Sequence, residues 1–471
     1  MKGVRVRFAP SPTGALHLGN VRTALYNYLY AKRHRGKFIF RIEDTDRERS
    51  SAELEQGIID NMGWLGIIPD EGIGPGGPQA PYRQTDRGEI YSRHFDQLLE
   101  QGDVYPCFCT PEELEAEREA TKRKGRAYQY SGRCRDLSAE KRTKFENESR
   151  RPTLRFRVPD EGELSFTDEI RGPITFQLQD IGDFVIRRSD GSPLYNVANV
   201  IDDALMQISH VIRGEEFIST TPTQVLLGQA LDLPIPHFAH LPLLLSPSGG
   251  KLSKREASVA VQGYRDQGYL AEAMVNFLVL LGWSPPGEED FFSLSQLEQL
   301  FDFDHVQKGG SQVDFDKLKH LNGRHLRALT VPELTDRLLK EEFIPTEWGG
   351  DRPKLERAAA TVQERLETLA GAADLLRFYF EPIEIPDFDR RELASHLREL
   401  TEELGSADFD QLEALHLFLG EFLAKRDLTP RQLFPALRLI LTGQKASPGI
   451  HQLLWALGRQ ESIRRLKTAL D

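Results

Sequence analysis

The feature that most restricts the fold of this chain lies near its N-terminus, where a strand, a loop, a helix and a second strand follow in order. Apolar residues alternate with arginines over 4–8, which is typical of a strand. Two prolines and Gly14 break this pattern, and apolar residues at helical spacing then follow His17. A second apolar stretch, 38–42, leads into acidic residues. Strand, helix and strand in this order predict a parallel sheet, whose ligand crevice lies at the carboxyl ends of the strands.

The loop before the helix is suited to phosphate. Its small residues let the backbone approach a ligand closely, and the helix start offers unpaired N–H groups and the positive end of its dipole. Ser11, His17 and Glu43 would all lie at this edge of the sheet. The tetrapeptide HLGN that begins at His17 is weak by itself, because ordinary helix starts contain similar sequences.

Length and composition narrow the class of protein. At 471 residues the chain is long enough for several domains, and its apolar and charged fractions, 39% and 28%, are those of a globular protein. No apolar run is long enough to span a membrane, and the chain enters its first strand without an export signal. With only 3 cysteines, no disulfide framework is expected, so we predict a cytoplasmic protein.

One segment carries a charge opposite to that of the whole chain. The net charge is −12, but residues 121–157 contain 13 Lys and Arg against 4 Asp and Glu, a net charge of +9. Such a segment could hold a nucleic-acid backbone on one face of an acidic protein. A solvated surface strip is the alternative interpretation.

After the first strands, the predicted secondary structure changes first to short antiparallel strands and later to helices. Residues 152–190 predict short antiparallel strands, so we interpret 105–190 as an insertion. The sheet pattern resumes with a helix over 193–203. Residues 266–282 predict an apolar-faced helix, and nearly everything from 325 to the end predicts amphipathic helices.

A second basic motif, KLSKR at 251–255, follows a Ser/Gly-rich turn and should lie on a loop. Two lysines three residues apart suit a clamp on a polyphosphate. A loop lysine that reaches a leaving pyrophosphate stabilises the transition state more than the ground state. A basic surface turn would look the same if this motif stood alone.

Together the two motifs resemble the paired signatures of class I aminoacyl-tRNA synthetases. HLGN at His17 looks like the HIGH motif of that family, and KLSKR at Lys251 looks like its KMSKS motif. The chain departs from these signatures at two peripheral positions, with Asn20 in place of His and Arg255 in place of Ser.

The resemblance extends over essentially the whole chain. The stretches 7–14 and 41–46 are similar to the glutamyl and glutaminyl subfamily. The stretches 321–323 and 438–443 are similar to the stem-contact and C-terminal regions of the bacterial glutamyl-tRNA synthetases.

This resemblance implies an α/β fold with a Rossmann-type parallel-sheet catalytic domain, an inserted α+β domain and an all-α C-terminal anticodon-binding region. The catalytic domain would comprise 1–104 and 191–248, and the insertion, which binds the acceptor end, 105–190. A stem-contact domain with the KMSKS-like loop would comprise 249–324, and the helical anticodon-binding domain 325–471.

Physical reasoning and the resemblance agree on an amino-acid pocket. A free glutamate needs a carboxylate for its ammonium group and cations for its carboxylates. Glu43 fits the first role, and Arg7 and Arg213 fit the second. Arg7 could instead be a surface strand residue. Remaining hydrogen bonds could come from Ser11, Asn199 and Tyr195, the last of which could instead be a core aromatic residue.

The resemblance also implies an ATP site and a two-step reaction. Glutamate would attack the α-phosphorus of ATP, with Mg²⁺ on the phosphates, and the resulting adenylate would be transferred to the terminal 2′-hydroxyl of tRNA. His17 and Lys254 would act as the catalytic residues, facing the developing phosphate charge, and Glu216 would hold the ribose. The implied ATP-binding residues are His17, Gly19, Glu216, Lys251, Ser253 and Lys254.

The cysteines have the spacing of a zinc site. Cys107 and Cys109 are followed, about two dozen residues later, by Cys134 and Asp136. The family carries a zinc-bearing insertion of this shape, often with His where Asp136 stands. Tyr130 is a rival fourth ligand, and three reduced thiols without a metal are the alternative. A bound zinc would be structural, because the pattern leaves no open position for water.

The expected partners are tRNA-Glu, glutamate and ATP, and we expect a monomer. Arg365 aligns with a position where family members that reject tRNA-Gln resemble one another in carrying Arg, although it could also be a solvated helix residue. A non-discriminating enzyme that also charges tRNA-Gln is the first alternative. A nucleotidylyltransferase that does not act on RNA and an inactive RNA-binding relative are more distant ones.

Overall fold

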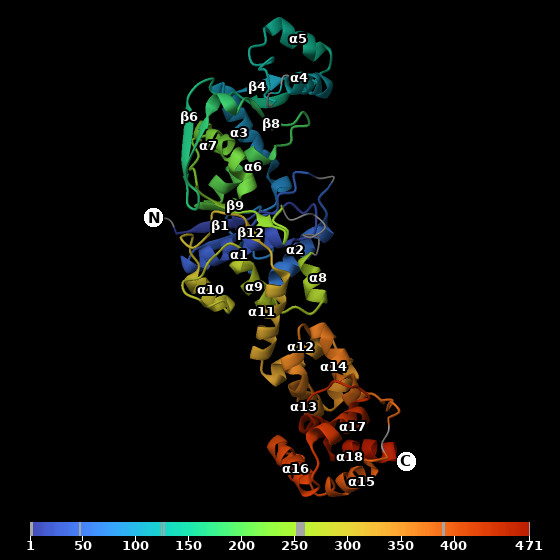
Figure 1. Ribbon diagram of the computed structural model, residues 1–471. Coiled ribbons are helices and arrows are strands. Elements are labelled where there is room, and N and C mark those ends of the chain that lie inside the picture. The colour runs from blue at the N-terminus through green and yellow to red at the C-terminus, as the bar shows by residue number, and fades with distance from the viewer. Residues whose placement is uncertain are drawn as a thin grey trace. The chain divides into compact units, whose positions relative to one another are not determined.

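The structure is a computed structural model (Figure 1), which forms two compact units. Unit 1 consists of 1–262 and 275–314, and unit 2 of 263–274 and 315–471. The described residues are 3–46, 49–123, 125, 128–250, 260–388 and 391–470.

Unit 1 is built on parallel strands, as predicted. Strands β1 (Arg5–Phe8), β2 (Lys37–Phe40) and β3 (Glu71–Gly72) pair in parallel in the order β1–β2–β3. Strands β9 (His210–Gly214) and β10 (His237–Leu241) pair in parallel in a second sheet. The sequence did not predict strand β3, because it lies inside a Gly- and Pro-rich segment that has no alternation of apolar and polar residues.

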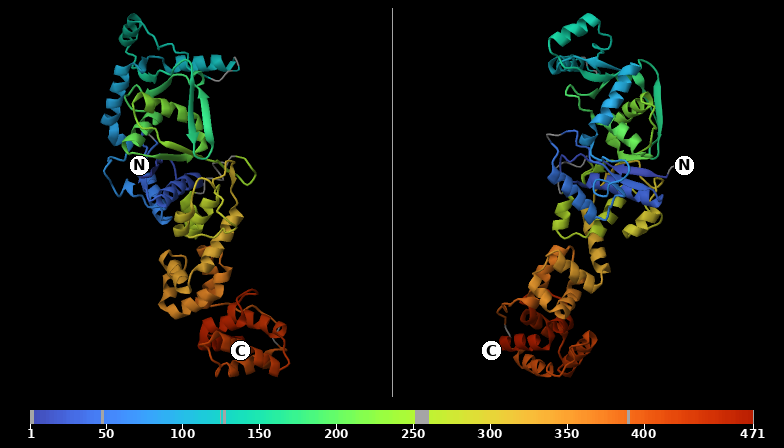
Figure 2. Two further views of the ribbon diagram at one scale, coloured as in Figure 1. Left: turned by 90° about the vertical axis from the view of Figure 1, so that its left-hand side faces the viewer. Right: turned by 180° about the vertical axis from the view of Figure 1, so that it is seen from behind.

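Backbone hydrogen bonds connect the two sheets. The Ser209 N–H donates to the Arg5 carbonyl over 2.8 Å, which places the start of β9 beside β1. The hairpin β6 (Glu163–Asp168) and β7 (Gly172–Gln177) extends the other side, because β6 pairs in parallel with β10 (Figure 2). A part of the predicted insertion therefore continues the sheet of β9 and β10.

Helices cover this sheet system and position its loops. Helix α1 (Leu18–Arg33) begins directly after the loop that follows β1, and its apolar side is buried. Helix α6 (Tyr195–Leu205) confirms the helix predicted over 193–203. The other helices of this part are α2 (Ala52–Trp64), α3 (Gly88–Gln101), α7 (Thr221–Ala230) and α10 (Leu294–Leu300).

The insertion carries a small antiparallel sheet, which confirms the predicted strand type. Its strands are β4 (Val104–Cys107), β5 (Thr153–Phe156) and β8 (Phe184–Arg187) in the order β4–β5–β8. Two exposed helices lie between β4 and β5 in the chain, α4 (Pro111–Arg123) and α5 (Ala139–Asn147).

The helix predicted over 266–282 is shorter than expected. The segment instead contains the end of α8 (Val261–Asp266) and the helix α9 (Ala271–Leu280). Gly268 separates them with a φ of 78°, a backbone conformation that side chains with a Cβ rarely adopt. Strands β11 (Leu244–Leu245) and β12 (Ser311–Gln312) form a separate parallel pair in unit 1.

All regular secondary structure in the described residues from 325 onward is helical, as predicted (Figure 1). The apolar core of unit 2 draws on all of its larger helices, although Leu417 is 59% exposed. The helices are α11 (Phe315–Ala328), α12 (Val331–Lys340), α13 (Arg352–Val362), α14 (Ala372–Phe380), α15 (Ala394–Glu403), α16 (Leu412–Lys425), α17 (Pro430–Thr442) and α18 (Ile450–Leu470). Throughout the described parts of the chain, every helix is too short or too polar to cross a membrane.

Candidate active site

A network of buried charges lies where β1 and β2 meet α6. Arg7, in β1, donates from Nε to Asp203 Oδ1 over 3.1 Å and from Nη2 to Asn199 Oδ1 over 3.3 Å. Asp203 and Asn199 lie one turn apart on α6. Arg7 is only 4% exposed, so it is a buried residue and not a surface strand residue.

Arg41 connects the two carboxylates of this network. It donates from Nη1 to Asp203 Oδ1 over 2.7 Å and from Nη2 to Glu43 Oε1 over 2.9 Å. Asn199 closes the ring, because its Nδ2 donates to the same Glu43 oxygen over 2.7 Å. The sequence reasoning missed Arg41 and Asp203. Arg41 lies in the stretch 41–46 that resembles the family, but no local pattern marks its pairing with Asp203, 162 positions later.

Burial and pairing set the ionisation of this network. Burial raises the pKa of Glu43, and Arg41 and Arg7 offset only part of that rise. Burial also favours the neutral form of Asp203, but Arg7 and Arg41 outweigh it and hold the pKa of that carboxyl below its ordinary value. Asp203 therefore stays ionised more readily than a free aspartate, whereas Glu43 ionises less readily than a free glutamate.

Arg213 lies in β9 and has a different environment. Its Nη2 donates to Thr221 Oγ1 over 2.9 Å and its Nε donates to His240 Nε2 over 3.2 Å. Its Nη1 is buried and has no hydrogen-bond partner among the described residues. A buried donor without an acceptor is costly, and this nitrogen could donate to a ligand oxygen. His240 and Thr221 were not predicted as site residues.

Tyr195 begins α6 and lies in the field of all three predicted charged residues. Burial and, to a smaller extent, Glu43 raise the pKa of its hydroxyl, Arg213 and Arg7 lower it, and the net result is a pKa of about 12. Tyr195 therefore lies close to these three residues. Ser11 is exposed in the loop after β1, and that loop is held near Glu43 because the Glu43 N–H donates to the Pro10 carbonyl over 3.1 Å.

His17 occupies the N-cap position of α1, with no side-chain capping bond. A Cβ atom added at Gly19 would lie 3.4 Å from two atoms of the His17 ring, in van der Waals contact, so the ring lies close to the helix start. His17 is exposed to solvent, but the surrounding protein partly desolvates its ring and so lowers its pKa, and the nearby Glu216 carboxylate offsets part of this effect. A neutral histidine, an open helix N-terminus and Glu216 thus lie close together, an arrangement suited to a nucleotide phosphate and its ribose.

The predicted residues Lys251, Ser253 and Lys254 lie outside the described residues, so their placement relative to His17 stays a prediction. The same is true of the whole KLSKR motif.

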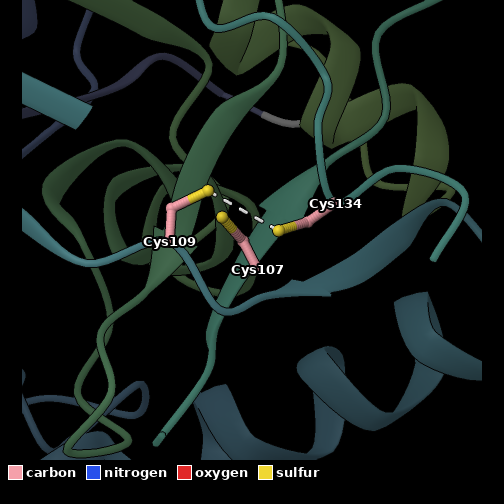
Figure 3. Close-up of side chains that lie close together, drawn as sticks. All are labelled: Cys107, Cys109 and Cys134. Atoms are coloured by element: carbon pink, nitrogen blue, oxygen red, sulfur yellow. Dashed lines mark hydrogen bonds between the residues drawn. The ribbon is translucent and has the colours of Figure 1, made fainter. Parts of the chain in front are cut away.

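The three cysteines come together in the insertion. Figure 3 shows that the sulfur atoms of Cys107, Cys109 and Cys134 converge, and all three lie within 4.8 Å of one another. The Cys109 and Cys134 sulfur atoms are 3.6 Å apart. Cys107 ends β4, and Cys134 comes from the segment between α4 and α5, so an ion bound here would connect these two parts.

The two candidate fourth ligands occupy different places. The Tyr130 hydroxyl lies 3.5 Å from the sulfur atoms of both Cys107 and Cys109 and accepts the Cys134 N–H over 3.0 Å. The Asp136 side chain is 81% exposed and pairs with Arg157 at 3.2 Å. The structure therefore brings Tyr130 to the thiols and does not bring Asp136 there.

Comparison with known proteins defines the family. Residues 3–320 match tRNA synthetases class I (E and Q), catalytic domain, and residues 331–470 match an anticodon binding domain. The chain belongs to the class I tRNA synthetases of this group.

Relatives of this synthetase are similar over their full length. It is 45% identical to the glutamate–tRNA ligase of Heliobacterium modesticaldum, over 100% of this chain and 97% of that protein. It is 43% identical to the glutamate–tRNA ligase of Symbiobacterium thermophilum, over 98% and 99%. A crystal structure of a glutamate tRNA ligase from Elizabethkingia meningosepticum, in complex with its amino acid, has a TM-score of 0.89 and 35% identity over 99% of both chains.

In unit 2 of the synthetase, Arg365 is exposed at the end of a short 3-10 helix, Gln363–Arg365. It lines a pocket of about 400 Å³ together with residues of α11. Three of these α11 residues are basic or can become so: Lys319, His320 and Arg327. Three carboxylates, Asp316, Glu364 and Glu367, line the same pocket, and Glu367 pairs with Lys319 at 2.7 Å, so part of its donor capacity is already used.

The basic segment of the synthetase uses part of its charge internally. Arg135 pairs with Asp160, Arg157 with Asp136, and Arg150 contacts Glu113 at 3.2 Å. These pairs reduce the positive charge available to a nucleic acid. The remaining basic residues on the exposed helix α5 are better placed for such contact.

Proposed function

We propose that this synthetase is a glutamate–tRNA ligase that selects glutamate with Arg7, Glu43 and Arg213. The named relatives, at 45% and 43% identity over nearly the full chain, support this function. The observation that carries the proposal is the charge pattern of the pocket. Arg7, Arg213 and Glu43 are all buried, and the Tyr195 hydroxyl lies within the electrostatic influence of all three. Two guanidinium groups and a carboxylate near one hydroxyl would complement the two carboxylates and the ammonium group of glutamate.

Each charged group has one position for the amino acid. The described donors to Glu43 both bind Oε1, which leaves Oε2 for the ligand ammonium. Arg213 Nη1 has no described partner and would take a ligand carboxylate. Arg7 is fixed through Nε and Nη2, so its Nη1 would face the other carboxylate. Tyr195 and Ser11 would supply the remaining hydrogen bonds.

The chemical step needs no nucleophilic side chain. The α-carboxylate of glutamate attacks the α-phosphorus of ATP, the bond to the β-phosphate oxygen breaks, and pyrophosphate leaves with its electron pair. The 2′-hydroxyl of the tRNA terminus then attacks the mixed anhydride, and AMP leaves. His17 and the N-terminus of α1 would stabilise phosphate charge, and Glu216 would hold the ribose. Roles for Lys251, Ser253, Lys254 and Mg²⁺ stay predictions.

The thiol cluster is proposed as a structural zinc site. Cys107, Cys109 and Cys134 would supply thiolates, and the proximity of Tyr130 supports its hydroxyl as the fourth ligand. Four protein ligands leave no position for a substrate. The zinc would therefore hold the segment between α4 and α5 against β4 and take no part in the reaction.

Arg365 is proposed to favour tRNA-Glu over tRNA-Gln. A guanidinium can make two hydrogen bonds to one base edge, and its pocket on α11 would hold that base. A non-discriminating enzyme that charges both tRNAs is the alternative. A monomeric state and a cytoplasmic location also stay predictions.

One pair of assays tests the proposed function. Aminoacylation with glutamate should succeed with purified tRNA-Glu and fail with tRNA-Gln. ATP–pyrophosphate exchange should require glutamate, and Lys254→Ala should slow it more than tenfold with little change in glutamate affinity. Charging of tRNA-Gln would favour the non-discriminating alternative. Exchange that proceeds without any amino acid would contradict the proposal and favour a nucleotidylyltransferase.

A further inference from the structure

A second group of buried polar residues is connected to Arg213 by hydrogen bonds. Asp168 ends β6, and its Oδ1 accepts the backbone N–H groups of Ile170 at 3.0 Å and Arg171 at 2.8 Å. Its Oδ2 lies 2.6 Å from His240 Nδ1. Asp168 and His240 are 1% and 0% exposed, so solvent does not compete for these bonds.

These bonds fix which nitrogen of His240 carries its proton. A carboxylate can only accept, so Nδ1 must be the donor to Asp168. Burial lowers the pKa of His240 against the opposing effect of Asp168, so the ring is neutral near pH 7. A neutral ring protonated on Nδ1 presents a lone pair on Nε2, and this lone pair accepts from Arg213 Nε over 3.2 Å.

Thr221 is oriented in a similar way. Two acceptors lie within reach of its hydroxyl proton, the Phe217 carbonyl at 3.0 Å and His240 Nε2 at 3.2 Å. With either of them, the Thr221 oxygen still accepts from Arg213 Nη2 over 2.9 Å. Arg213 is thus held by two neutral acceptors. The carboxylate of the group, Asp168, is kept one imidazole ring away.

We propose that Asp168, His240 and Thr221 form a positioning device for Arg213. They fix the plane of the guanidinium and aim Nη1 at the amino acid, and they leave the positive charge to be balanced by the ligand. This inference rests on the proposed function, in which Arg213 binds a carboxylate of glutamate.

The use of neutral acceptors has a consequence for substrate choice. A buried guanidinium without a hydrogen-bonded carboxylate favours a ligand that brings a negative charge, and the neutral amide of glutamine brings none. A carboxylate directly on Arg213 would remove this preference. His240 therefore acts as a spacer that keeps the anion Asp168 in place without letting it neutralise Arg213.

Two substitutions of His240 separate the hydrogen bond from the shape of the ring. His240→Gln keeps an acceptor near the position of Nε2, whereas His240→Phe keeps the ring and removes the acceptor. In ATP–pyrophosphate exchange with tRNA, H240F should raise the KM for glutamate at least tenfold. H240Q should recover most of this loss, and both variants should keep the KM for ATP within twofold. The matched control is H237Q, on the same strand at an exposed position, which should match the wild type.

The outcomes distinguish the inference from the function on which it rests. Equal glutamate KM values for H240F and the wild type, or equal losses in H240F and H240Q, would overturn the inference alone. A wild-type chain that does not activate glutamate would overturn the proposed function. If circular dichroism shows that H240F does not fold, the glutamate KM of Thr221→Val tests the inference in its place. A threefold or larger rise in glutamate KM supports the positioning role, and a value within twofold of wild type overturns it.

Discussion

Asp203 offers the most direct test of the buried network. Its Oδ1 accepts from Arg7 over 3.1 Å and from Arg41 over 2.7 Å, and all three side chains are buried. Asp203→Asn keeps the shape of the side chain, but it removes the negative charge and replaces one acceptor oxygen with a donor. The two guanidinium groups would then lose their shared hydrogen-bonded anion.

The expected loss of stability follows from these contacts. Removing one partner of a buried ion pair costs about 3–5 kcal/mol. We expect the lower value, about 3 kcal/mol, because Arg41 would still form ion pairs with Glu43 at 2.9 Å and with Asp202 at 3.9 Å, so its charge would not be left unpaired. Arg7 would also lose a bond that orients it, so the KM for glutamate should rise about tenfold, which corresponds to about 1.4 kcal/mol.

Urea unfolding followed by circular dichroism measures the first effect, and ATP–pyrophosphate exchange measures the second. Asp96→Asn, at an exposed position on α3, is the control and should change stability by less than about 0.5 kcal/mol. The folded pKa of Asp203 is depressed, so its contribution is present above about pH 4 and is lost as the pH falls through the folded value. The D203N and wild-type curves should therefore approach each other at acid pH. An equal free energy of unfolding for D203N and wild type at pH 7 would refute the reasoning.

Three further predictions concern other parts of the chain. Arg365→Gln should raise kcat/KM for tRNA-Gln relative to tRNA-Glu about tenfold in aminoacylation, the value of one base contact, and an unchanged ratio would argue against base reading by Arg365. Tyr130→Phe should lower the zinc content that survives dialysis against a chelator, whereas Asp136→Asn should not; the reverse order would assign the fourth ligand to Asp136. Burial lowers the pKa of His210 to about 4, so between about pH 6.5 and 4 the unfolded chain binds a proton that the folded chain does not, and stability falls as the pH falls. His210→Gln should reduce the stability lost between pH 7 and pH 5 by about 1 kcal/mol, which thermal unfolding at the two pH values measures. An equal loss in the variant and the wild type would show that the reasoning is wrong.

The sequence predicted well those features that depend on neighbouring residues. Strand alternation before His17, the helix that begins at Tyr195 and the amphipathic helices of unit 2 are local patterns, and the structure confirms them. The family signatures added the pocket residues Arg7 and Arg213, which the structure places near one another.

The features that the sequence did not predict are contacts between side chains that are far apart in the chain. Arg41 and Asp203 are separated by 162 positions, and neither has a local pattern that marks a charged residue as buried. The interaction of Asp168 with His240 joins a hairpin of the insertion to a strand of the sheet, so it requires the topology. The choice between Tyr130 and Asp136 turns on which side chain faces the thiols, a question that spacing alone does not answer.

Asn199 has an effect that goes beyond its two hydrogen bonds. Its amide donates to Glu43 and accepts from Arg7, so a neutral group stands between an acid and a base that would otherwise be drawn into direct contact. Each of the two already has a charged partner of its own, because Glu43 pairs with Arg41 and Arg7 pairs with Asp203. By keeping these two ion pairs from merging, a single amide would leave one oxygen of the acid and one nitrogen of the base for the opposite charges of a zwitterion.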